Sequence, residues 1–291
     1  MGATSQDRGS TRARRLDGRV CLPDGPSADG WLVAVHGISR RAREQAELLG
    51  PMSRRLGLAL AAPRFGRRRF DDYQRLGRAG RGERADLALL DWLDALAGQH
   101  GIDARRVWLV GYSGGAQFVH RFALVHPDRV RGYVAAAPGW FTWPDTTVRF
   151  PFGAAASRRL PDAAPCLDAW LRVPAVAAVG TLDSGPHQAL RDTTRVRSQQ
   201  GGSRIERARA WVAAMNARAV ERGIPPHFGY EELPGAGHSF RRCVSAGGLD
   251  RVIESALCRM GLAGRAGETT PEPPTFAAPG QPRTVERARA A

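Results

Sequence analysis

The chain has 291 residues, of which 43% are hydrophobic, so it is long enough for one or two domains with a sizeable core. Its formal net charge is +15 and all 43 basic residues are arginine, but they are scattered instead of alternating with aromatic residues on one element, which argues against specific nucleic-acid binding. The sequence has no run of about 18 apolar residues and no apolar leader, so we expect neither a membrane span nor secretion, and predict a cytoplasmic protein.

The first part of the chain predicts an arm, then a strand, a helix and a second strand. Residues 1–18 are polar and basic, and we expect them to form a flexible arm. The continuous apolar run 30–37 ends in glycine, which is typical of a strand buried on both faces. Residues 45–57 have helical spacing with a candidate break at Gly50-Pro51, and residues 58–65 predict the next strand.

Helices and strands alternate through the rest of the chain. Helices are expected over 82–101, 116–130, 203–223 and 248–260; a strand and turn over 105–115; strands over 131–140 and 173–183; and a last short strand and loop over 227–240. The tail 264–291 is rich in Pro, Thr and Ala and is expected to be disordered, which leaves one domain over residues 19–263. This alternation predicts an α/β fold with a mostly parallel central sheet flanked by helices, whose chemistry gathers at the carboxyl ends of the strands.

One serine stands between glycines where a predicted strand meets a predicted helix. The residues Gly111-Tyr112-Ser113-Gly114-Gly115 match G-x-S-x-G, and they follow the apolar stretch "VWLV". A sharp strand-to-helix turn holds its middle residue in a strained conformation with the side chain exposed, and small flanking residues let the backbone approach its neighbours. We therefore predict that Ser113 is a nucleophile.

A backbone site for a negatively charged oxygen is expected beside Ser113. The helix that follows points its N-terminal N–H groups back at the serine, so the N–H of Gly114 can stabilise developing negative charge. The stretch "VAVHGIS" places His36-Gly37 directly after an early strand, where the N–H of Ile38 would supply a second donor. We predict that Ile38 and Gly114 form an oxyanion hole and that His36 shapes the loop.

Two further residues are candidates for an acid and a base. Asp183 ends the predicted strand 173–183, where a carboxylate can hold an imidazole in one tautomer, although "LDSGP" is also a plausible turn. His238 lies in the glycine-rich loop "LPGAGHSF" after the last predicted strand, from which its ring can reach a neighbouring strand end. Asp162 and Asp168 are the rival acids, and His187 is the rival base.

In these motifs the sequence resembles the alpha/beta-hydrolase superfamily, over roughly residues 20–262. It contains, in order, HG, G-x-S-x-G, an Asp at a strand end and G-x-G-H. The resemblance implies the alpha/beta-hydrolase fold, with an eight-stranded, mostly parallel sheet and with Ser113, Asp183 and His238 as nucleophile, acid and base. Within the superfamily the chain looks like the compact esterase and polyester-depolymerase branch, or the peptidase-like branch.

An aromatic-rich insertion at about residues 138–172 lies between the predicted nucleophile and acid. As a short cap it would line the substrate pocket with Tyr112, Trp140, Phe141 and Trp143. The alternative is a small satellite core beneath a long loop, and Tyr112 can instead pack under the turn. The arginines of residues 64–77 either bind a carboxylate of the substrate or are solvated, and we favour the second interpretation.

These patterns favour a serine esterase that cleaves small or medium carboxylic esters by two-step acyl transfer, without a metal or an organic cofactor. A serine peptidase of the same fold and a non-catalytic binding protein with an arginine-rich surface are the alternatives, and the oligomeric state is left open. Cys21, Cys166, Cys243 and Cys258 lack the spacing of metal ligands and predict reduced thiols, while a disulfide between Cys166 and Cys243 stays open.

Overall fold

The structure, a computed structural model of the chain, describes residues 16–25, 28–161, 163–185, 190 and 193–262. Within these residues seven strands form one sheet in the order β1-β3-β2-β4-β5-β6-β7. Their bounds are β1 (Asp17–Cys21), β2 (Trp31–Val35), β3 (Ala59–Arg64), β4 (Val107–Tyr112), β5 (Val130–Ala136), β6 (Ala175–Gly180) and β7 (Phe228–Leu233). Every neighbouring pair is parallel except β1 and β3, which confirms the expected mostly parallel sheet.

The edge strand β1 is the one described strand that the sequence did not predict, and the short helices α4 (Leu167–Leu171), α5 (Thr194–Gln200) and α7 (Phe240–Ser245) were not predicted either. Asp17 and Arg19 are exposed and the strand has only five residues, so its composition resembles that of a polar arm. Leu16 is buried and Asp17 pairs with Arg64, so β1 joins the sheet and includes residues 17 and 18 of the expected arm. The described strands number seven, against the eight that the resemblance implies; the rest of the arm (1–15) and the tail (264–291) lie outside the described residues.

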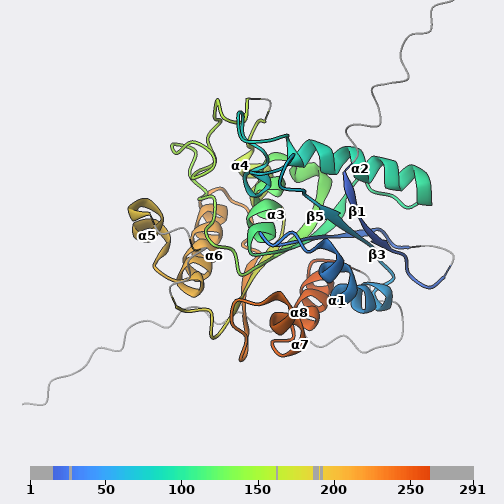
Figure 1. The fold of residues 1–291 in the computed structure, drawn as a ribbon. Coiled ribbons are helices and arrows are strands. Elements are labelled where there is room, and N and C mark those ends of the chain that lie inside the picture. Colours follow the sequence, from blue (N-terminus) through green and yellow to red (C-terminus); the bar gives the residue numbers. More distant parts are fainter. Residues whose placement is uncertain (1–15, 26–27, 162, 186–189, 191–192, 263–291) are drawn as a thin grey trace, which may run out of the picture.

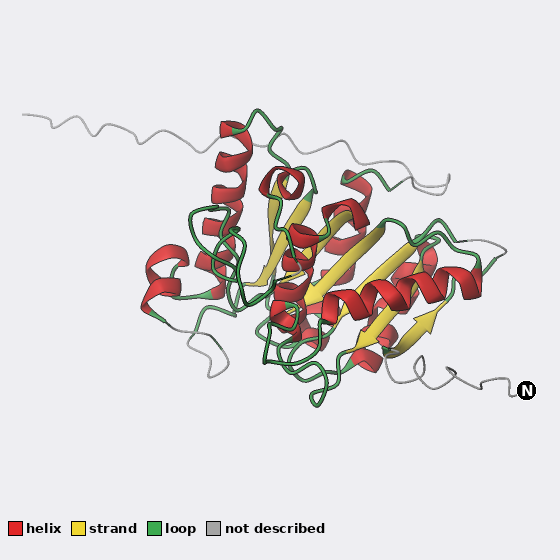
Figure 2. Cartoon of the chain, turned by 90° about the horizontal axis from the view of Figure 1, so that it is seen from above, coloured by secondary structure: helices red, strands yellow, loops and turns green. Residues whose placement is uncertain are grey.

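Helices cover both faces of the sheet (Figures 1 and 2). One face carries α1 (Ala42–Arg55), α7 (Phe240–Ser245) and α8 (Leu249–Arg259). The opposite face carries α2 (Ala85–His100), α3 (Gly114–Val125), α4 (Leu167–Leu171) and α6 (Arg204–Glu221), with α5 (Thr194–Gln200) packed on α6. Two short 3-10 turns, η1 (Tyr73–Arg75) and η2 (Pro127–Arg129), complete the described elements.

Helix α1 continues through the candidate break at Gly50-Pro51. A proline inside a helix loses one hydrogen bond and crowds the carbonyl four residues earlier, here that of Glu47. Pro51 and Glu47 are both exposed, so this carbonyl can turn toward water, and the buried side of the helix keeps its bonds.

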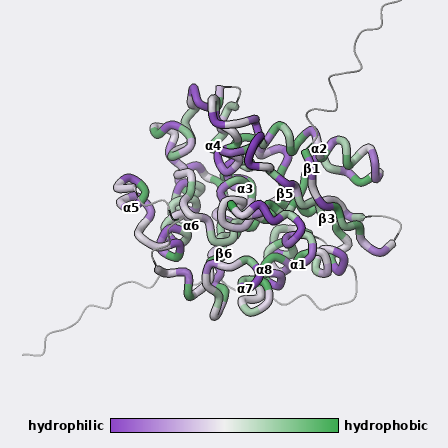
Figure 3. Tube along the Cα trace, viewed as in Figure 1, coloured by the Kyte–Doolittle hydropathy of each residue, from purple (hydrophilic) through white to green (hydrophobic). Residues whose placement is uncertain are grey.

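The core consists of two layers, one on each side of the sheet. In β2, Trp31, Val33 and Val35 point into the layer with α2, α3 and α6, while Leu32 and Ala34 point into the layer with α1 and α8. Figure 3 shows the hydrophobic residues along the strands in the middle of the molecule. Because every residue of β2 is buried, the strand reads as a continuous apolar run and not as an alternating one.

Trp211 in α6 is the centre of an aromatic cluster between α6 and the segment after β5. Its ring stacks on Phe141 at 4.5 Å between centroids and contacts the rings of Trp170 and Phe228 at 6.2 and 5.8 Å. Its indole N–H donates to the backbone carbonyl of Thr142, 3.1 Å away. The tryptophan therefore fixes the start of the insertion against the sheet.

We expect Trp211→Ala to lower the free energy of unfolding by about 3–5 kcal/mol, because it removes a fully buried indole and leaves the carbonyl of Thr142 without its donor. Urea denaturation measures the effect. Leu87→Ala is the control, since Leu87 is 41% exposed on α2 and its truncation should change stability by less than about 1 kcal/mol. Equal denaturation midpoints for the two variants would contradict the assignment of this cluster to the core.

Candidate active site

Ser113 occupies a tight turn between β4 and α3. Its backbone has φ 53° and ψ −110°, a strained conformation for a residue other than glycine. The turn requires small neighbours: a Cβ on Gly111 would lie 2.2 Å from the carbonyl oxygen of Gly115, and one on Gly115 would lie 2.0 Å from that of Val35. The glycines of the motif are therefore needed for packing, and the turn holds the serine at the carboxyl edge of the sheet.

The structure brings Ser113, His238 and Asp183 together. The Oγ of Ser113 lies 3.1 Å from Nε2 of His238, and Nδ1 of His238 lies 2.7 Å from Oδ2 of Asp183. With Nδ1–H donating to the carboxylate, Nε2 is left to accept the proton of the serine hydroxyl. Asp183 follows β6 and His238 follows β7, so the three side chains come from the carboxyl ends of three strands. Ser113 and Asp183 are 8% and 5% exposed.

The loop that carries His238 is packed closely against the end of β6. A Cβ on Gly180 would lie 2.1 Å from the carbonyl oxygen of Ala236. Beneath the imidazole, the ring of Tyr112 stacks on His238 at 5.3 Å and contacts Phe240 at the same distance. Tyr112 is 7% exposed, and its burial raises the pKa of its phenol. Of the two expected placements of Tyr112, the structure has the one in which it packs under the turn and supports His238.

Arg204 is a site residue that sequence reasoning missed. It is the first residue of α6, and its Nη1 donates to Oδ1 of Asp183 over 2.8 Å. The side chains of this ion pair are 1% and 4% exposed. Each carboxylate oxygen of Asp183 thus accepts one bond, from His238 or from Arg204. In the sequence Arg204 is one of many arginines in this helix, and only its place after the Ser203 cap distinguishes it.

The two predicted backbone donors flank the serine. A Cβ on Gly114 would lie 3.4 Å from the backbone nitrogen of Ile38 and 2.6 Å from the hydroxyl of Tyr73, so these groups surround the start of α3. As the first residue of the helix, Gly114 has an N–H without an acceptor inside α3. The side chain of Ile38 is 47% exposed, which leaves an apolar surface beside this position.

His36 fixes the loop that carries Ile38. Its Nδ1 lies 2.8 Å from the carbonyl oxygen of Gly37, and its Nε2 accepts the backbone N–H of Phe65 over 3.0 Å. The hydroxyl of Tyr73 donates to the carbonyl of His36 over 2.9 Å. These bonds require a neutral imidazole, and burial, with the charge of Arg40 acting in the same direction, lowers the pKa of His36 to about 4. As expected, this histidine shapes the loop.

The aromatic residues of the insertion lie mostly in the core. Trp140 is 1% exposed and lies under the guanidinium of Arg121, 4.1 Å from its ring centre. Phe141 is fully buried, and its backbone N–H and carbonyl both bond to the side chain of Gln200. Trp143 is partly buried against the same core. The structure thus has the packed core beneath a long loop in place of the expected pocket wall of Trp140 and Phe141, because Arg121 of α3 covers Trp140 while α5 and α6 supply partners for Phe141.

The rival residues have other partners or lie outside the described residues. Asp168 is exposed and pairs with Arg222, while Asp162 and His187 are not described. The other described histidines have contacts elsewhere: Nε2 of His126 lies 2.8 Å from Asp86, for example, and the ring of His100 lies against that of Trp31. The described residues contain no group of three or more His, Cys, Asp or Glu side chains that could hold a metal ion. They also contain no helix long and apolar enough to span a membrane.

The four cysteines are free thiols in the structure. Cys166 is exposed and Cys243 is buried in α7, so the pair left open by the sequence is not joined. Burial raises the pKa of the Cys243 thiol to about 11, which keeps it protonated and unreactive at neutral pH.

A seven-stranded sheet with a strained serine turn after β4 and a histidine loop after β7 is the alpha/beta-hydrolase fold, and solved structures of that fold are similar to this chain. No family model and no curated protein matches the sequence. Poly(aspartic acid) hydrolase-1 from Sphingomonas sp. KT-1 is 24% identical with a TM-score of 0.68, over 82% of this chain and 92% of that one.

Two further structural neighbours are named for the breakdown of esters. LpqC, a poly(3-hydroxybutyrate) depolymerase from Bordetella parapertussis, is 24% identical with a TM-score of 0.67, over 84% of this chain and 87% of that one. Esterase PE8 is 17% identical with a TM-score of 0.51, over 84% of this chain and 98% of that one. At these identities the comparisons establish the fold, and the chemistry must be argued from the residues.

The stability of the protein should fall between pH 7 and pH 4 because of His36. Its pKa is lowered from 6.5 to about 4 on folding, so between these values the unfolded chain binds a proton that the folded chain does not. Stability is therefore lost as the pH drops below 6.5, by up to about 3 kcal/mol for this group. Urea denaturation at pH 7, 5.5 and 4 measures the loss.

The variant His36→Gln isolates this contribution. It should have a smaller loss of stability over the same pH range than the unmodified protein, and some dependence should persist because burial also lowers the pKa of His120. Identical pH dependence in the variant and the unmodified protein would contradict a neutral, buried His36.

Proposed function

We propose that the protein is a serine hydrolase that cleaves carboxylic esters through an acyl-enzyme intermediate. The observation that carries the proposal is the hydrogen-bonded series from Ser113 through His238 to Asp183 at the carboxyl edge of the sheet. A strained serine, an imidazole with one nitrogen on the serine, and a buried carboxylate on the other nitrogen are the parts that nucleophilic acyl transfer requires. The neighbours named for ester breakdown support the same reaction class.

In the proposed first step, Oγ of Ser113 attacks the ester carbonyl while Nε2 of His238 takes the hydroxyl proton. The carbonyl oxygen becomes an oxyanion, which the backbone N–H groups of Gly114 and Ile38 stabilise. His238 then gives its proton to the departing alkoxide, and the acyl group stays on the serine. Asp183 keeps the imidazole in the required tautomer and stabilises its charged form.

In the proposed second step, water hydrolyses the acyl-enzyme. His238 takes a proton from the attacking water, the same N–H groups of Gly114 and Ile38 bind the new oxyanion, and the proton returns to Oγ of Ser113 as the carboxylic acid leaves. The exposed side chain of Ile38 and the partly buried Trp143 are the apolar residues that we expect a small or medium acyl group to meet.

Amide hydrolysis is the second candidate. One structural neighbour is named a poly(aspartic acid) hydrolase, and poly(aspartic acid) is joined by amide bonds. The same serine, imidazole and carboxylate can cleave either bond, because the two reactions differ mainly in the protonation of the leaving group. A panel of p-nitrophenyl esters of rising chain length beside aminoacyl anilides separates the candidates. Hydrolysis of anilides without hydrolysis of esters would reverse our ranking.

We expect Ser113→Ala to abolish labelling by a fluorophosphonate probe and to lower kcat for p-nitrophenyl esters by about 10⁶, because the nucleophile is lost while binding is kept. Ser198→Ala is the matched control, since Ser198 is exposed on α5 and its hydroxyl donates to the carbonyl of Arg195 within the same helix. Undiminished turnover in Ser113→Ala would refute the assignment. No labelling of the unmodified protein would favour a binding protein instead of an enzyme.

Arg204 is proposed as a positioning residue that acts through Asp183. Replacement by Met removes the bond to Oδ1 and leaves a buried carboxylate without its cation, so the carboxylate can turn away from His238. We expect Arg204→Met to lower kcat by about tenfold or more with little change in KM, since the Arg204 side chain is buried behind Asp183 and is not exposed to a bound substrate.

The variant Arg204→Lys distinguishes a positioning role from a role in stability alone. A lysine keeps the charge with a different geometry, and it should restore part of kcat. Urea denaturation of both variants measures stability separately. Loss of stability in Arg204→Met with unchanged kcat in the folded fraction would assign Arg204 to the fold alone.

A further inference from the structure

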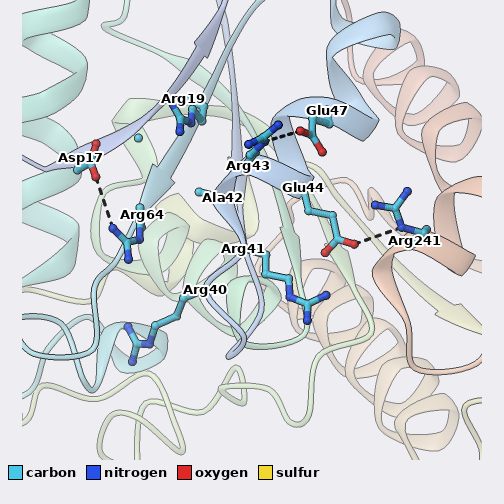
Figure 4. A pocket seen from close by; sticks show the side chains of 11 residues that line it. Asp17, Arg19, Arg40, Arg41, Ala42, Arg43, Glu44, Glu47, Arg64 and Arg241 are labelled. Carbon is cyan, nitrogen blue, oxygen red and sulfur yellow. Dashed lines mark hydrogen bonds and ion pairs between the residues drawn. The ribbon is translucent and has the colours of Figure 1, made fainter.

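An arginine-lined cavity lies at the carboxyl edge of the sheet, outside the proposed catalytic residues (Figure 4). Its volume is about 470 Å³, and it is formed by β1, the end of β3, the loop after β2, the first two turns of α1 and the first turn of α7. The basic residues that line it are Arg19, Arg40, Arg41, Arg43, Arg64 and Arg241.

The carboxylates of the cavity do not balance these six guanidinium groups. Asp17, Glu44 and Glu47 are its only acidic lining residues among those the structure describes. Glu47 lies 2.6 Å from Arg43, whereas Glu44 lies 3.6 Å from Arg241 and Asp17 lies 3.8 Å from Arg64.

Two of the arginines in the cavity have no carboxylate partner. Within the described residues no acidic side chain pairs with Arg19 or Arg41, and both side chains are exposed. Arg40 is different, since its guanidinium bonds to the carbonyls of Phe65, Phe70 and Asp71, supports the neighbouring loop and lies 3.9 Å from the carboxylate of Asp71. The cavity therefore has two guanidinium groups, those of Arg19 and Arg41, whose N–H donors are available to a ligand.

The cavity adjoins the proposed active site through two segments. Arg41 is three residues after Ile38, in the loop whose N–H is a proposed oxyanion donor, and Arg241 is three residues after His238. Arg64 ends β3, which pairs with β2, and β2 pairs with β4; the carboxyl ends of these three parallel strands lie at the same edge as Ser113. A substrate bound at Ser113 and extended past Ile38 toward β1 would thus reach these arginines.

We propose that this cavity is a subsite for a carboxylate carried by the substrate, at a distance from the scissile ester. Guanidinium groups bind carboxylates with paired, charge-assisted hydrogen bonds, which a neutral acyl chain cannot offer. The N-terminus of α1 also faces this side, and its cap residue Arg41 makes no side-chain capping bond. This inference rests on the proposed ester hydrolysis and assigns its substrate class as anionic esters.

The test compares two p-nitrophenyl esters of the same chain length, one with a terminal methyl group and one with a terminal carboxylate. The unmodified protein should have a kcat/KM at least about tenfold higher for the carboxylate ester at low salt, and the preference should shrink with added salt. The double variant Arg19→Gln/Arg41→Gln should lose most of this preference and keep its kcat/KM for the methyl ester within about twofold. A third ester of the same chain length with a terminal phosphate tests whether the cavity prefers a carboxylate to a phosphate.

Arg105→Gln is the matched control, because Arg105 is exposed beside the amino end of β4, on the opposite edge of the sheet. It removes one exposed positive charge, against two in the double variant, and should leave the preference unchanged. An equal loss in Arg105→Gln, or no preference in the unmodified protein, overturns the subsite while ester hydrolysis stands. A larger preference for the phosphate ester overturns the carboxylate assignment. Failure of every ester and of fluorophosphonate labelling overturns the proposed function itself.

Discussion

The contacts of the His238 imidazole are the interaction on which the candidate site depends. One ring links Ser113 after β4 to Asp183 after β6, and it stands on a loop that follows β7. Such a link exists only if the carboxyl ends of these strands share one edge, which the parallel pairing from β4 to β7 guarantees. Tyr112 supports the ring from below. The fold thus converts residues that are 125 and 55 positions apart into one hydrogen-bonded unit.

Buried arginines hold the backbone around this unit. Arg207 donates to the carbonyls of Gly139 and Gly201, and Arg121 donates to the carbonyl of Gln74 and to the hydroxyl of Thr142. A buried guanidinium is costly unless its N–H groups are bonded, and here carbonyl oxygens of loops provide acceptors. Arg204 differs in that it bonds to a carboxylate. Part of the positive charge of the chain is therefore structural, and these buried arginines join the insertion to α3 and α6.

The sequence predicted the elements whose pattern is local. The buried strands, the serine turn and the main helices follow from apolar runs and from glycines that a close backbone approach requires. It failed where the outcome depends on distant partners. Nothing local marks Arg204 as the partner of Asp183, or Trp140 as a core residue beneath Arg121. The edge strand β1 was missed because an exposed, charged strand has the composition of a polar arm.

Every basic residue of the chain is an arginine, and this has one consequence in the protein interior and another at the solvent-facing cavity beside β1. In the interior, one planar guanidinium can bond several carbonyls, as Arg40 does with those of Phe70 and Asp71, and an ammonium group cannot match this geometry. At the cavity beside β1, the exposed guanidinium groups of Arg19 and Arg41 have no carboxylate partner among the described residues. A guanidinium whose N–H groups bond to backbone carbonyls in the interior therefore fixes loops. A guanidinium whose N–H groups face solvent can instead bind an anion. The loop from His36 to Arg41 joins the two environments, and it places the proposed oxyanion donor of Ile38 between them.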